Sequence, residues 1–134
     1  MKTCFLLLGV FAVLAMAERV DANTFSRLDR ETAGLMDAWT GQRNGSSGSF
    51  TSGTAMIRVR SALAAARNAE VLFMPDEAKR KWTAYLKASA DCLFSFRLAL
   101  ENVNSSESEE ILLASFTRWT AAGEEFLNSV QSTR

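Results

Sequence analysis

The stretch that decides the fold is PDEAKRKWTAYLKASADCLFSFRLALENV, which runs from Pro75 to Val103. Its apolar and small residues recur at steps of three and four, the spacing that places side chains along one side of an α-helix. They are Ala78, Trp82, Tyr85, Leu86, Ser89, Cys92, Leu93, Phe96, Leu100 and Val103. Pro75 suits a first helical position, and the acidic Asp76 and Glu77 complement the positive end of the helix dipole. The stretch therefore predicts one long amphipathic helix that faces two neighbours.

Three further segments have the same periodicity. One helix is predicted from Asn23 to Trp39, and a second from Thr54, as its N-cap, to about Phe73. The last helix is predicted to begin with a capping box formed by Ser106 and Glu109. No segment alternates between apolar and polar residues for long enough to predict a strand. The sequence predicts an all-α fold, an antiparallel up-and-down four-helix bundle.

A segment rich in glycine and serine separates the first two predicted helices. It runs from Thr40 to Gly53, TGQRNGSSGSFTSG, and has no apolar periodicity. Such a composition is typical of a long flexible loop, because it offers little surface to bury. Phe50 is the one large apolar residue in it.

The amino terminus, MKTCFLLLGVFAVLAMA, resembles a secretory signal peptide. It has one lysine, an apolar run and small residues at Ala15 and Ala17, as a signal peptidase requires. We expect residues 1–17 to be removed and 18–134 to form a single domain, although the small residues at Val20 and Ala22 offer a second cleavage site. The predicted location is extracellular, or periplasmic in a bacterial source.

Cysteine usage limits how the mature chain is stabilised. The chain has two cysteines, and Cys4 leaves with the predicted signal. Cys92 alone cannot form an internal disulfide, so stability has to come from packing. We expect Cys92 to be buried as a small apolar residue, with an intermolecular disulfide as the alternative.

Composition excludes several classes of function. Fifteen basic residues balance fifteen acidic ones, which argues against a nucleic-acid partner. The chain has no histidine, the usual general base near neutral pH and the commonest metal ligand. We therefore expect no enzymatic activity, no metal and no cofactor.

Two groups of residues do not fit a purely structural reading. Arg60 and Arg67 share a side of the second predicted helix with apolar residues, and could hold the carboxylate or sulfate of a ligand. Phe94 and Leu98 lie one turn apart on the back of the long helix. They either pack beneath the predicted loop, against Phe50, or form a surface for a partner together with it.

The sequence favours a secreted, non-enzymatic binding protein that engages a protein partner through a helix face. The alternative is an extracellular carrier of a small apolar, lipid-like ligand between the helices, because many aromatic residues point inward. We expect a monomer without a membrane span, with a disulfide-linked dimer through Cys92 as the alternative. Asn44 and Asn104 stand in N-x-Ser patterns that could carry glycans in a eukaryotic source.

Overall fold

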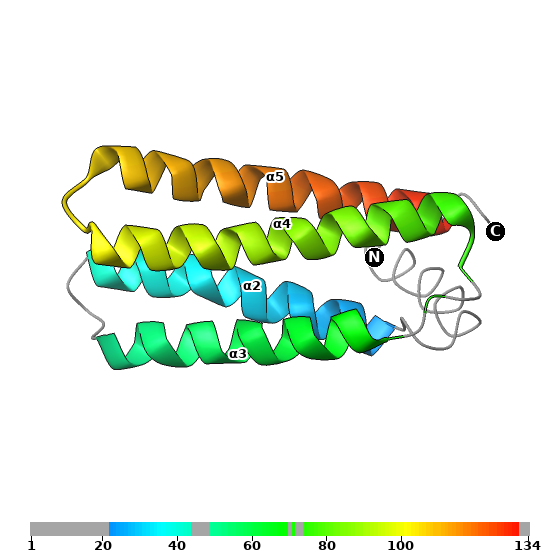
Figure 1. Ribbon diagram of the computed structural model, residues 1–134, viewed down its shortest axis with the longest axis horizontal. Coiled ribbons are helices and arrows are strands. Elements are labelled where there is room, and N and C mark those ends of the chain that lie inside the picture. The colour runs from blue at the N-terminus through cyan, green and yellow to red at the C-terminus, as the bar shows by residue number, and fades with distance from the viewer. Residues whose placement is uncertain (1–21, 44–48, 70, 72–73, 132–134) are drawn as a thin grey trace, which may run out of the picture.

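The computed structural model describes residues 22–43, 49–69, 71 and 74–131. This part of the chain contains helices and no strand: α2 (Ala22–Arg43), α3 (Ser49–Asn68), α4 (Asp76–Glu101) and α5 (Ser106–Gln131) (Figure 1). Consecutive helices run in opposite directions, so the predicted all-α, up-and-down bundle is confirmed. The predicted signal peptide, residues 1–17, lies outside the described residues.

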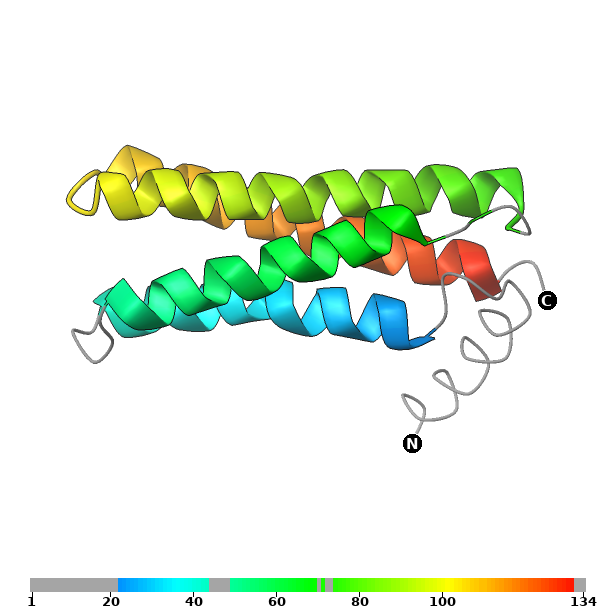
Figure 2. The ribbon, with the colours of Figure 1, turned by 60° about the horizontal axis from the view of Figure 1, so that its bottom comes forward.

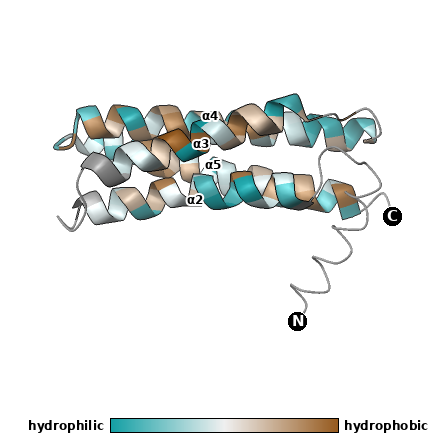
Figure 3. Cartoon of the chain, turned by 90° about the horizontal axis from the view of Figure 1, so that it is seen from below, coloured by the Kyte–Doolittle hydropathy of each residue, from teal (hydrophilic) through white to brown (hydrophobic). Residues whose placement is uncertain are grey.

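The four helices form a diamond in cross-section. α2 packs closely on α3, and α4 on α5 (Figures 1 and 2). Seen from below, α3 lies in front and α5 behind, with α4 and α2 on either side (Figure 3). α2 also contacts α4 across the bundle. These two helices occupy the short diagonal, and α3 and α5 lie at opposite corners.

Aromatic rings fill the centre of the bundle. Tyr85 of α4 is fully buried and stacks on Phe25 of α2 at a centroid distance of 5.0 Å. Phe126 of α5 lies 5.0 Å from the ring of Trp82. The Tyr85 hydroxyl donates a 2.8 Å hydrogen bond to Asp29 Oδ1, which satisfies the one polar atom of that ring. The rings of three helices therefore form a single core.

The predicted loop from Thr40 to Gly53 is shorter than expected. α2 continues to Arg43, and α3 begins at Ser49, five residues before the predicted cap at Thr54. Ser52, inside the added first turn of α3, is 1% exposed. Helix propensity is a weak effect that packing overrides, so glycine and serine are helical here. The remaining connection, residues 44–48, lies outside the described residues.

The other predicted helix ends are wrong by one or a few residues. α3 ends at Asn68 instead of about Phe73, and α4 ends at Glu101 instead of Val103. Pro75 is the N-cap of α4 and not its first helical residue. The cap of α5 is Ser105, whose Oγ accepts a 3.1 Å hydrogen bond from the Ser108 amide. The predicted capping box of Ser106 and Glu109 is therefore wrong, because Ser106 is already helical. The Glu109 carboxylate accepts the indole N–H of Trp39 at 3.2 Å.

Two helical glycines should respond in different ways to an added methyl group. A Cβ at Gly34 in α2 meets no atom within 4 Å, whereas one at Gly123 in α5 would lie 3.1 Å from the Tyr85 ring. Alanine gains about 0.5–1 kcal/mol over glycine inside a helix. We expect Gly34→Ala to raise the free energy of unfolding by that amount, and Gly123→Ala to gain clearly less because the ring must move. Urea denaturation of both variants measures the difference; equal gains would contradict the close packing at Gly123.

Candidate functional site

The outer face of α4 carries the most exposed large apolar side chain among the described residues. Phe94 is 65% exposed, and Leu98, one turn further along, is half-buried. A surface ion pair between Lys87 and Asp91, 3.1 Å apart, lies on the same outer side of the helix. The structure therefore places the predicted pair Phe94 and Leu98 on a solvent-facing surface edged by charge.

A third apolar residue extends this surface onto α5. Ser95 Oγ and Ser115 Oγ are 2.8 Å apart in a hydrogen bond that fixes the register of α4 against α5. Leu98 follows Ser95 by three residues, and Ile111 precedes Ser115 by four. Leu98 and Ile111 therefore both lie about one helical turn from this hydrogen bond, toward the connection between α4 and α5. Ile111 is 42% exposed. We call Phe94, Leu98 and Ile111 the α4 outer patch.

Phe50 cannot be added to this patch. Its backbone belongs to the first turn of α3 and not to a loop, because α3 begins at Ser49. Its side chain lies outside the described residues. The prediction that Phe50 covers or extends the patch rested on the longer loop.

Arg60 and Arg67 are both exposed on α3. Seven residues, or about 10.5 Å along the helix axis, separate them. Neither has a hydrogen bond or ion pair with any other described residue. Their spacing suits two separate anionic groups better than the single ligand carboxylate or sulfate that the sequence suggested. Glu70, which follows Arg67 by three residues, lies outside the described residues.

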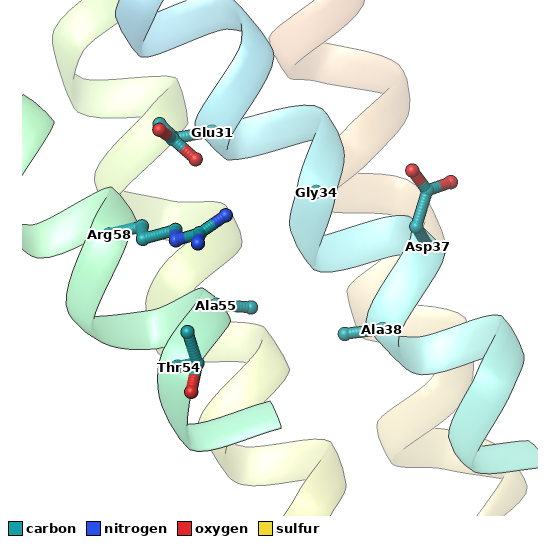
Figure 4. Close-up of a pocket in the computed structure, with 7 residues that line it drawn as sticks. All are labelled: Glu31, Gly34, Asp37, Ala38, Thr54, Ala55 and Arg58. Atoms are coloured by element: carbon teal, nitrogen blue, oxygen red, sulfur yellow. The ribbon is translucent and has the colours of Figure 1, made fainter. Parts of the chain in front are cut away.

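A groove between α2 and α3 was not predicted. It has a volume of about 340 Å³ and is lined by Glu31, Gly34, Asp37, Ala38, Thr54, Ala55 and Arg58. Figure 4 shows the guanidinium of Arg58 extending toward α2 on the Glu31 side, while the Asp37 carboxylate points away from it. The groove exists because small residues, Gly34, Ala38 and Ala55, face each other. The spacing of these small residues is visible in the sequence, but it predicts a groove only if the two helix faces are known to meet.

Cys92 is a buried, unpaired thiol. Burial raises its pKa to about 12, and the nearby charge of Asp91 adds to the rise, while Arg118 opposes it. A thiol with so high a pKa is a poor nucleophile at neutral pH. With no exposed surface, its sulfur is also out of reach of a second chain. Burial in the core, the first of the two expectations, agrees with the structure, and burial argues against the disulfide-linked dimer.

The described residues contain no cluster of three or more potential metal ligands. Among the described helices, none combines the length and apolar character needed to cross a bilayer.

No family model, curated protein or solved structure matches this chain.

Proposed function

We propose that the protein is a secreted, non-enzymatic binding protein that engages a protein partner through the α4 outer patch. The observation that carries this proposal is the 65% exposure of Phe94 well inside the long helix α4. A large aromatic side chain held in solvent is unfavourable, whereas aromatic residues are enriched where protein interfaces are buried.

The rest of the patch supports the same function. Leu98 and Ile111 provide further apolar surface beside Phe94, and Lys87 and Asp91 provide charged groups nearby. An apolar centre with charged residues around it is the usual composition of an interface. The amino-terminal sequence supports secretion, because it has the basic start, apolar run and small residues of a signal peptide.

The alternative, a carrier of a small apolar ligand, needs space between the helices. The aromatic rings of α2, α4 and α5 pack against one another at the centre of the bundle. A Cβ added to Gly123 would already crowd Tyr85. This packing favours the partner surface over the carrier.

Site-specific crosslinking tests the proposal. A photoreactive phenylalanine analogue at position 94 should yield a crosslinked product with one defined protein in the extracellular fluid of the source organism. The same analogue at Thr83 is the control, because Thr83 is exposed and lies about three turns away on the same side of α4.

The outcomes of this experiment are distinct. A product from position 94 that is absent from position 83, and that is lost in the variant Leu98→Asp, is the expected result. Equal products from both positions would mean that the patch is not specific. A lipid-like mass bound to the protein in native mass spectrometry, without a crosslinked protein, would favour the carrier.

A further inference from the structure

Exposed charges of opposite sign lie on the two far corners of the bundle. α3 contains no acidic residue, and its arginines at 58, 60 and 67 are exposed. α5 contains five glutamates and one arginine. Glu125 pairs with Lys81, and Glu109 accepts a hydrogen bond from Trp39. The other three glutamates, Glu107, Glu110 and Glu124, are exposed. None of these six outward charges makes a hydrogen bond or ion pair with another described residue.

Each corner also presents an apolar side chain among its charges. Ile57 on α3 is 63% exposed and precedes Arg60 by three residues. Leu113 on α5 is 43% exposed and follows Glu110 by three residues. Residues three or seven apart share one side of a helix, and eleven residues complete about three turns. We call Ile57, Arg60 and Arg67 the α3 ridge, and Glu110, Leu113 and Glu124 the α5 ridge.

The two ridges cannot pair within one molecule. α3 lies in front and α5 behind in Figure 3, with α2 and α4 between them. We propose that the α3 ridge of one molecule binds the α5 ridge of a second copy, so that molecules associate head to tail. Charge complementarity identifies the occupant, because each copy carries both the cationic ridge and its anionic, partly apolar counterpart.

This contact has predictable properties. It is heterologous, joining different surfaces of the two copies, so it extends into short chains instead of closing as a symmetric dimer. A single helix-on-helix contact is at the small end of protein interfaces, and its charges are exposed, so association is weak, reversible and sensitive to salt. The formal net charge of zero means that no overall repulsion opposes it. This association goes beyond the monomer expected from the sequence, and it does not depend on the α4 outer patch.

Sedimentation velocity of the full chain over a concentration series tests the proposal. The sedimentation coefficient should rise with concentration at about 0.01 M salt, where the screening length is about 30 Å, and stay constant at about 1 M salt, where it is about 3 Å. Two charge-reversed variants identify the surfaces. Arg60→Glu with Arg67→Glu makes both ridges acidic, and Glu110→Arg with Glu124→Arg makes both basic. Each variant alone should associate at least about tenfold more weakly than the unmodified chain.

An equal mixture of the two variants should regain association, because the reversed ridges complement each other across molecules. The matched control, Lys87→Glu with Arg97→Glu on α4, changes the net charge as the first variant does but leaves both ridges intact; it should associate like the unmodified chain. Circular dichroism verifies that each variant is helical. If the double variant Arg60→Glu with Arg67→Glu fails to fold, the single variant Arg67→Glu takes its place.

Three results would overturn the proposal. They are a monomer at low salt and the highest concentration, association that salt or the ridge variants leave unchanged, and a mixture that associates no better than its components. If the chain is monomeric at low salt, the complement of the α3 ridge would instead be an acidic face of a different protein.

Discussion

Replacing Phe126 by alanine should lower the free energy of unfolding by about 3–5 kcal/mol, the usual cost of removing a buried phenylalanine. The side chain is fully buried, and its ring contacts Phe25, Trp82 and Tyr85 at centroid distances of 5.7, 5.0 and 6.4 Å. Its loss removes contacts that join α5 to both α2 and α4. The close-packed rings leave little freedom for neighbouring side chains to fill the cavity.

Urea denaturation measures this effect, and Glu110→Gln on the same helix is the control. Glu110 is exposed and unpaired among the described residues. The free energy of unfolding of the Glu110→Gln variant should therefore differ from that of the unmodified protein by no more than about 0.5 kcal/mol. Similar midpoints for the two variants would contradict the central place of Phe126 in the core.

Stability should fall steeply in alkaline solution because of two buried groups. Burial raises the pKa of Cys92 from its ordinary value to about 12. Burial also raises the pKa of Tyr85 well above its ordinary range, and the charge of Asp29 and its hydrogen bond to the hydroxyl add to the rise. Both groups keep their protons in the folded protein at pH values where the unfolded chain loses them.

The sign of the pH dependence follows from this difference. The folded state binds more protons than the unfolded state above the ordinary pKa values, about 8.5 for cysteine and 10 for tyrosine, so the free energy of unfolding decreases as pH rises. Each group contributes a slope of up to about 1.4 kcal/mol per pH unit, for Cys92 until the pH approaches 12.

Urea unfolding between about pH 8 and 11 measures this slope. Cys92→Ala should remove the part that begins near the ordinary cysteine pKa, and Tyr85→Phe the part that begins near that of tyrosine. The slope is the readout, since each variant also changes packing. A slope that neither substitution reduces would show that other groups cause the alkaline loss.

The sequence predicted the helical bundle correctly because its signals were local and repeated. The three- and four-residue spacing identified α4, and the buried residues Trp82, Tyr85 and Phe96 all lie in the predicted stripe. Spacing alone did not predict the depth of burial. Trp119, in the middle of the last stripe, is only half-buried, whereas Phe126 is fully buried. Depth depends on which neighbours a helix faces, and periodicity contains no such information.

Composition was a poorer guide than periodicity. Glycine and serine between Thr40 and Gly53 predicted a loop, but much of that segment is helical because tertiary packing supplies what intrinsic propensity lacks. The exposure of Phe94 was predictable from its place on the back of α4. The addition of Ile111 to the patch, the groove at Gly34 and the opposition of α3 and α5 were not, because each depends on how separate helices are arranged.

The diamond arrangement also bears on how the chain folds. The closest helix contacts join neighbours in sequence, α2 with α3 and α4 with α5, and fewer contacts cross between the two hairpins. Contacts of short sequence separation close small loops, so each hairpin can form rapidly and with little loss of chain entropy. The stacking of Phe25 on Tyr85 and Phe126 joins residues from the two halves. We therefore expect the docking of the two hairpins through these rings to be the step that makes folding cooperative.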